Sequence, residues 1–142
     1  MESFLIESQL DPSDADVAPI DRGLHTYNQR AADLAAIHRF ACYARSPEGT
    51  LVGGALARWW GTACELQQLW VDEALRRRGI GALLMQRVEA TAIERGCRLI
   101  YLDTFSFQAP EFYYGLGYEI ACRLDGFPDG GSKFILRKAL VK

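Results

Sequence analysis

The chain has 142 residues, which suits one domain built around a single hydrophobic core. Its formal net charge of −2 gives no overall basic field, so nucleic-acid binding is not expected. No apolar run reaches the ~18 residues of a membrane-spanning helix, and the N-terminus lacks the basic and apolar regions of a signal peptide. We therefore expect one cytoplasmic domain, residues 1–142, with neither a nucleic-acid nor a membrane partner.

The first half of the chain predicts strands interrupted by one helix. Residues Ser3–Gln9 alternate in polarity, which favours a strand, and Ser13 could cap a helix whose apolar residues recur from Val17 to about Asn28. A weaker helix or loop follows at Arg30–Ile37. Tight turns then separate three expected strands, at His38–Arg45, Leu51–Trp60 and Cys64–Val71.

The second half predicts a long helix and three more strands. An apolar face begins at Ile80 and ends at Gly96, which marks the end of a helix. The expected elements after it are a strand at Arg98–Thr104, a short helix at Pro110–Leu116, and strands at Tyr118–Leu124 and Lys133–Lys138. This order predicts an α/β (α+β) fold with a mixed, mostly antiparallel sheet of six or seven strands and about four helices.

The cysteines and histidines do not indicate a metal site. Cys42, Cys64, Cys97 and Cys122 are widely spaced and form no C-x-x-C pair, so we expect buried, reduced thiols. The two histidines have no ligand-like spacing with each other or with a cysteine. We expect no bound metal.

The most informative stretch runs from Leu69 to Leu84, where a strand turns into a helix. Gly79 and Gly81 leave the backbone N–H groups at the helix start open to a ligand, and no Ser, Thr, Asp or Asn precedes them as a cap. Three arginines stand beside the positive end of the helix dipole, where each cation is unfavourable by ~0.3–1 kcal/mol. A bound pyrophosphate would offset these unfavourable terms, so we expect an anion site here.

Two motifs together resemble the GNAT family of N-acetyltransferases. Arg76-x-x-Gly79-x-Gly81 is similar to the family's pyrophosphate loop, Arg/Gln-x-x-Gly-x-Gly/Ala. The segment Gln108–Tyr118, QAPEFYYGLGY, resembles the later helix that ends in Phe/Leu-Tyr-x-x-x-Gly-Phe/Tyr. The motifs and their neighbouring elements cover roughly residues 64–138, and the region before them carries no motif of the family.

The resemblance implies the binding of acetyl-CoA where the fourth and fifth strands of the family's sheet splay apart. Those strands correspond to Cys64–Val71 and Arg98–Thr104. Backbone groups of one strand would pair with the pantetheine arm, and the N–H groups of Arg77–Ala82 would hold the pyrophosphate. The implied cofactor-binding residues are Leu69, Trp70, Val71, Arg76, Arg77, Arg78, Gly79, Ile80, Gly81, Ala82 and Tyr113.

The implied reaction is direct attack of an amine on the thioester. A lysine-like amine has a pKa of ~10.4, so a general base assists by taking its proton. Glu65 is the first candidate for this base, Asp103 is its rival, and water is the third possibility. Tyr113 matches the tyrosine that protonates the departing thiolate in several members. Ser106 and Gln108 occupy the region where members often carry an asparagine that contacts pantetheine.

The acceptor is expected to be a primary amine of a small molecule or peptide. Aromatic residues could line its pocket or pack in the core: Trp59, Trp60, Phe105, Phe107 and Phe127. Two alternatives remain open: a non-catalytic acyl-CoA-binding or sensor domain, and an acyltransferase for protein lysines or longer acyl chains. Exposed strand edges make a homodimer a further expectation.

Overall fold

The computed structural model describes residues 3–141. They divide into two compact units, one that ends at Ala35 and one that begins at Ala36. No helix within the described range is long and apolar enough to cross a membrane.

The first unit contains one long helix, α1 (Asp14–Ala31). Ser13 caps it as predicted: the Ser13 hydroxyl accepts a hydrogen bond from the Asp16 N–H (3.2 Å), and the Asp16 carboxylate accepts one from the Ser13 N–H (3.3 Å). The strand predicted at Ser3–Gln9 is wrong, because this segment is irregular and exposed. Alternation alone does not form a strand when no neighbouring strand supplies ladder hydrogen bonds.

The second unit is a six-stranded mixed sheet with two further α-helices. Its strands are β1 (His38–Arg45), β2 (Leu51–Trp60), β3 (Ala63–Val71), β4 (Leu99–Phe105), β5 (Glu119–Phe127) and β6 (Gly131–Ala139). The order across the sheet is β1-β2-β3-β4-β6-β5, and only β3 and β4 run parallel. The predicted fold class is confirmed, with six strands and three α-helices in the described residues.

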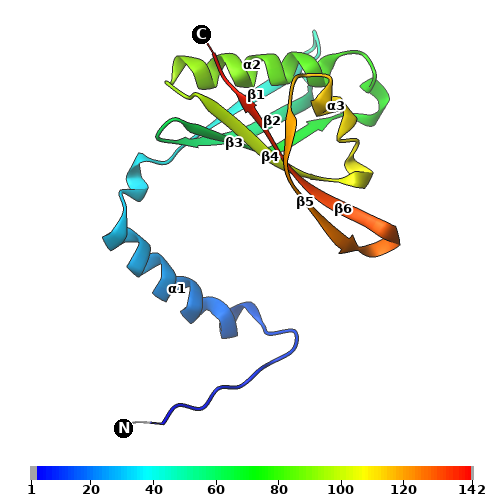
Figure 1. Ribbon diagram of the computed structural model, residues 1–142. Helices are drawn as coiled ribbons and strands as arrows, with labels where there is room; N and C mark the ends of the chain where they lie inside the picture. Colours follow the sequence, from blue (N-terminus) through cyan, green and yellow to red (C-terminus); the bar gives the residue numbers. More distant parts are fainter. Residues whose placement is uncertain (1–2, 142) are drawn as a thin grey trace. The chain divides into compact units, whose positions relative to one another are not determined.

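Helix α2 (Ile80–Glu94) makes the parallel connection and packs against β1, β2 and β3 (Figure 1). Its buried face consists of Leu84, Met85, Val88 and Ala92. These side chains meet buried residues of the sheet, among them Ala57, Cys64, Ile100 and Leu136. Burial of apolar surface contributes about 25 cal/mol per Å², so this layer is the main source of the unit's stability.

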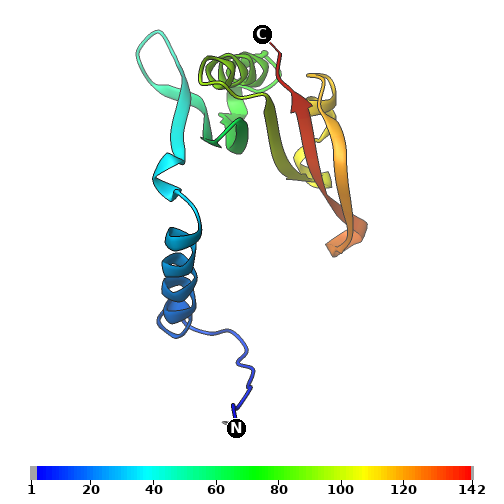
Figure 2. The ribbon, with the colours of Figure 1, turned by 60° about the vertical axis from the view of Figure 1, so that its left-hand side comes forward.

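The hairpin of β5 and β6 forms the edge of the sheet opposite β1 (Figure 2). Strand β5 is exposed along most of its length, including Ile120 and Leu124. Cys122 lies on this strand and is exposed, which corrects the expectation that all four thiols are buried. The remaining cysteines, Cys42, Cys64 and Cys97, are buried and free as expected.

Candidate functional site

The two parallel strands β3 and β4 pair over a short distance only. Their ladder begins at Ala63 with Leu99 and ends at Glu65 with Tyr101. Beyond this point the strands diverge, although β3 stays paired with β2 as far as Val71. The β4-facing edge of residues 66–71 therefore has no strand partner, and the predicted splay is present.

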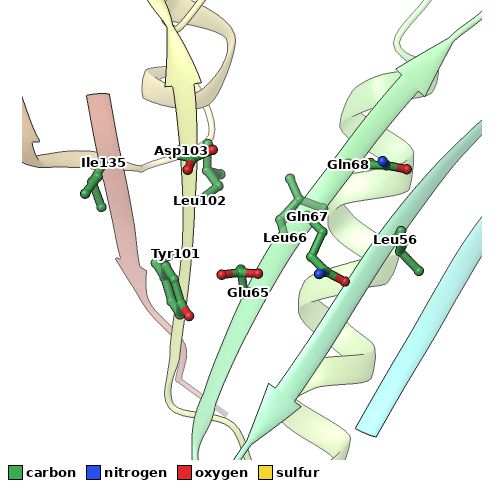
Figure 3. A pocket seen from close by; sticks show the side chains of 9 residues that line it. All are labelled: Leu56, Glu65, Leu66, Gln67, Gln68, Tyr101, Leu102, Asp103 and Ile135. Carbon is green, nitrogen blue, oxygen red and sulfur yellow. The ribbon is translucent and has the colours of Figure 1, made fainter. Parts of the chain in front are cut away.

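A β-bulge lies at the point of divergence. Leu66 pairs with Ala57, and Gln68 pairs with Leu56, so Gln67 is the extra residue in β3. Bulges bend a strand and change the direction of its side chains and N–H groups. The bulge lies where β3 and β4 separate, and in Figure 3 the side chains of Gln67 and Gln68 extend from β3 on the side away from β4.

The gap contains a cleft with two adjoining parts. Both parts are lined by Leu66, Gln67, Gln68, Leu102 and Asp103. The first part has a volume of about 390 Å³ and adds Leu56, Glu65, Tyr101 and Ile135 (Figure 3). The second has a volume of about 250 Å³ and adds Leu69, Thr104, Gln108 and Tyr113. Among the described residues that line either part, two are carboxylates and none is Lys, Arg or His.

The two carboxylates differ in exposure and in their partners. The Glu65 side chain is 25% exposed, and its Oε1 accepts from the Arg58 Nε at 3.1 Å. The Asp103 side chain is 65% exposed and lies 3.5 Å from the Lys133 Nζ. Burial raises the pKa of Tyr101, and the adjacent Glu65 carboxylate raises it further. Tyr101 is therefore a neutral hydroxyl beside Glu65 at neutral pH.

Tyr113 enters the second part of the cleft from α3 (Glu111–Tyr114). Its side chain is buried between two aromatic rings: Phe112 at a centroid distance of 5.0 Å and Tyr118 at 5.8 Å. Burial raises the pKa of Tyr113, so the hydroxyl keeps its proton near neutral pH. Glu65 and Tyr113 therefore line different parts of the cleft, and these parts share five lining residues.

The corner after β3 has the backbone geometry of an anion site. Gly79 is the N-cap residue of α2 with φ +82°, and no side chain caps the helix within the described chain. The first helical hydrogen bond runs from the Leu83 N–H to the Gly79 carbonyl oxygen. The N–H groups of residues 80–82 come before this bond and have no acceptor within the helix. Arg77 also has a left-handed φ, +64°, which costs about 1–2 kcal/mol for a residue with a Cβ.

The three arginines of the corner are exposed but not equivalent. Arg76 donates from Nε to the Val71 oxygen at 3.1 Å, which ties the loop to the end of β3. Arg77 and Arg78 form none of the described ion pairs or side-chain hydrogen bonds and stand in solvent. Trp70 is 48% exposed, and Leu69 lines the cleft.

Gly81 has a packing role that the sequence did not indicate. A Cβ at this position would lie 3.3 Å from Cζ of Phe112 and 3.9 Å from Cγ2 of Val71. The glycine lets α2 approach α3 closely. At Gly79, by contrast, an added Cβ would meet nothing within 4 Å.

Two polar side chains that the sequence placed near pantetheine accept hydrogen bonds from the backbone, although Gln108 also lines the second part of the cleft. The Gln108 Oε1 accepts from the Phe105 N–H at 2.9 Å, and the Ser106 hydroxyl accepts from the Ser132 N–H at 3.0 Å. Phe105 contacts Phe107 and Phe127 in one aromatic cluster at the end of β4. The two tryptophans, Trp59 and Trp60, do not line the cleft.

Sequence reasoning missed Gln67, Gln68 and Tyr101 as lining residues. Tyr101 could have been found, because Tyr101 and Asp103 alternate along one strand and must share a face. The glutamines could not, since no Gly or Pro marks the bulge in which they lie.

Known proteins resemble this chain along most of its length. The model of the acetyltransferase (GNAT) family matches residues 9–118. Blasticidin-S acetyltransferase from Streptomyces morookaense is 36% identical over 102 residues, which cover 71% of this chain and 75% of that protein. An acetyltransferase structure from Bacillus cereus is 31% identical with a TM-score of 0.78, over 94% of this chain and 98% of the other. An aminoglycoside 6'-N-acetyltransferase in complex with coenzyme A shares the fold at 22% identity and a TM-score of 0.65, over 92% and 82%.

Proposed function

This chain belongs to the GNAT family of acetyltransferases, and from that premise we propose that it transfers the acetyl group of acetyl-CoA directly to the amine of a small molecule in the β3–β4 cleft. One observation carries the proposal. The unpaired edge of β3 runs from a cleft with two carboxylates to the uncapped, arginine-flanked start of α2. Family membership indicates the reaction, the transfer of an acetyl group. The geometry indicates from which end of β3 acetyl-CoA and the amine would each approach.

The donor enters along β3. The pyrophosphate of acetyl-CoA accepts hydrogen bonds from the N–H groups of residues 80–82, with Arg77 and Arg78 adding positive charge. The pantetheine arm pairs with the free edge of Leu69–Val71 in the manner of an added strand. The coenzyme A complex of the aminoglycoside acetyltransferase, which shares this fold, supports coenzyme A as the carrier.

The chemistry needs no protein nucleophile. The amine nitrogen attacks the thioester carbon, a C–N bond forms and the C–S bond breaks. One proton leaves the amine and one reaches the sulfur. Backbone N–H groups of the bulged strand stabilise the negative charge that develops on the carbonyl oxygen.

Glu65 takes the amine proton, directly or through water. It lies in the larger part of the cleft and is less exposed than Asp103, so it reaches an amine held between the strands. Asp103 lines both parts and is the alternative base. Tyr113 is the proton donor to the departing thiolate: it lines the cleft, and because burial raises the pKa of its hydroxyl, the proton is present at neutral pH.

The cleft selects a cationic acceptor of modest size. Two carboxylates and no basic side chain line it within the described residues, so a protonated amine is attracted more than an anion. The relative that is named for the acetylation of blasticidin S supports a small-molecule acceptor.

We further propose that the protein is a cytoplasmic homodimer. Tyr43 on β1 and Ile120 and Leu124 on β5 are exposed apolar side chains at the two edges of the sheet, which supports pairing of two copies. Three buried free thiols suit the reducing cytoplasm.

An acceptor screen tests the function. Release of the CoA thiol is measured with acetyl-CoA and a panel of cationic, neutral and anionic amines, and mass spectrometry identifies the product. We expect thiol release only with an amine, fastest for cationic small molecules, and one N-acetylated product per thiol. Binding of acetyl-CoA with no amine-dependent release would favour the sensor alternative.

A further inference from the structure

A second polar cluster lies on the helix side of the sheet, outside the cleft. It joins Glu89 of α2, Tyr118 just before β5, and Lys138 near the end of β6. The Tyr118 hydroxyl donates to Glu89 Oε2 at 3.0 Å, and the Lys138 Nζ donates to Glu89 Oε1 at 2.7 Å. The side chains of Glu89 and Lys138 are only 16% and 29% exposed, and Tyr118 is buried.

The cluster reaches the turn that ends α3. The Lys138 Nζ also donates to the Leu116 oxygen at 2.7 Å, and its ammonium lies 5.6 Å from the centre of the Tyr118 ring. Gly117 in this turn has φ +93°, and a Cβ at this position would lie 3.5 Å from Cε of Lys138. Helix α3 has only four residues, too few to be stable by its own hydrogen bonds. Its direction therefore depends on neighbouring contacts such as these.

Tyr113 depends on the same turn through two contacts with Tyr118. The Tyr118 ring packs edge-on against the Tyr113 ring, at a centroid distance of 5.8 Å and an angle of 75°. The backbone N–H of Tyr118 donates to the backbone carbonyl oxygen of Tyr113 at 3.1 Å. The Tyr118 ring and backbone therefore both contact Tyr113, which lines the cleft.

We propose that Glu89 and Tyr118 are positioning residues for Tyr113: the Tyr118–Glu89 hydrogen bond, held by Lys138, fixes the Tyr118 ring and thereby the direction of the Tyr113 hydroxyl. This inference rests on the proposed function, in which Tyr113 protonates the thiolate. Neither Glu89 nor Tyr118 lines the β3–β4 cleft, so both act through Tyr113. Displacements of about 1 Å at a reacting group can cost up to ~10²-fold in rate.

A double-mutant cycle on the full chain tests the inference. Tyr118→Phe removes the hydroxyl and keeps the ring, and Tyr113→Phe removes the proposed acid. We expect Tyr113→Phe to lower kcat by ~10²-fold and Tyr118→Phe by about five- to tenfold, the range of one lost hydrogen bond. The KM for acetyl-CoA should change little in both. The double variant should match Tyr113→Phe, because Tyr118 has no further group to position.

Two controls separate positioning from general loss of structure. Tyr114→Phe removes a hydroxyl from the same helix, but this side chain is 37% exposed and does not line the cleft. It should leave kcat unchanged. Glu89→Gln keeps an oxygen that accepts from Tyr118, so it should lose less activity than Glu89→Ala, with thermal unfolding measured for each.

The outcomes are distinct. Losses that multiply in the double variant, or an unchanged kcat in Tyr118→Phe, would overturn the positioning role and leave the proposed function intact. An active parent whose kcat is unaffected by Tyr113→Phe would remove the acid, and this inference with it. A parent with no amine-dependent thiol release would overturn the proposed function itself.

Discussion

At the scale of single residues, the two carboxylates of the cleft differ in their position along the strands and in their exposure to solvent. Glu65 stands where β3 and β4 begin to diverge and forms an ion pair with Arg58, whereas Asp103 lies further along β4 and closer to solvent. Because exposed ion pairs contribute only about 0–1 kcal/mol, neither pair is needed for folding. Substitutions of these carboxylates therefore test their proposed catalytic role with little effect on folding.

Glu65→Gln should lower kcat by ~10²-fold or more, the range of a lost general base. The loss should be largest at low pH, where the neutral amine is scarcest, and a pH–rate profile measures it. Arg58→Gln is the control, because it breaks the same ion pair and keeps the carboxylate. If Glu65→Gln overlays the parent and Asp103→Asn does not, the base is Asp103.

A second prediction at the residue scale concerns the reactivity of the cysteine thiols toward an alkylating reagent. Burial raises the pKa of Cys64 to about 12, with smaller contributions from its neighbours Cys97, Glu65 and Cys42. At pH 8 roughly one molecule in 10⁴ then carries the Cys64 thiolate. Cys122 is exposed on β5. Iodoacetamide should label one site in the folded protein, and Cys122→Ser should abolish that fast labelling. Rapid modification of Cys64 in the folded Cys122→Ser variant would contradict the burial described.

At the scale of elements, the start of α2 and the splay of β3 from β4 were predictable to different degrees. The uncapped, glycine-containing helix start could be predicted because capping residues are identifiable in sequence, and α2 begins at Ile80. The splay came only from the family resemblance, since unpaired strand edges leave no local pattern. The bulge at Gln67 was not predictable, and the N-terminal strand was wrong because a strand requires a partner that alternation does not specify.

Two matched glycine variants test the anion site proposed at the start of α2. Gly79 and Gly49 both have left-handed φ, +82° and +87°, and both have open space where a Cβ would lie. Replacement by Ala should therefore strain the backbone equally at the two sites, by about 1 kcal/mol. Only Gly79→Ala places a methyl group at the anion site, so calorimetry should show about tenfold weaker CoA binding in that variant alone. Equal affinities in the two variants would argue against this site.

Tyr118, in the turn after α3, leads to a prediction about the free energy of unfolding at high pH. Burial raises the pKa of Tyr118, and the Glu89 carboxylate raises it further. Above the ordinary tyrosine pKa of ~10 the unfolded chain releases this proton while the folded protein keeps it. The free energy of unfolding should then fall by about 1.4 kcal/mol per pH unit from this group. Urea titrations between about pH 10 and pH 11 should show a shallower fall for Tyr118→Phe. Parallel curves for parent and variant would mean that Tyr118 ionises in the folded state.

At the scale of the whole molecule, the hydrophobic core and the proposed site both lie in the unit that begins at Ala36. Every buried apolar residue described lies between Cys42 and Leu140, and α1 buries none. The cleft, the proposed anion site and the cluster of Glu89, Tyr118 and Lys138 all belong to this unit. The sequence predicted the order of its helices and strands along the chain, from β1 to β6, because short connections and hydrophobic periodicity leave a local pattern.

Direct transfer of the acetyl group to an amine is the central claim, and rapid mixing with acetyl-CoA tests it most directly. Thiol release and the intact mass of the protein are followed in the presence and absence of a cationic amine. We predict no thiol burst and no acetylated protein without the amine, and thiol release matched by N-acetylated amine when it is present. A burst of thiol with an acetyl group on the protein, in the absence of amine, would contradict direct transfer.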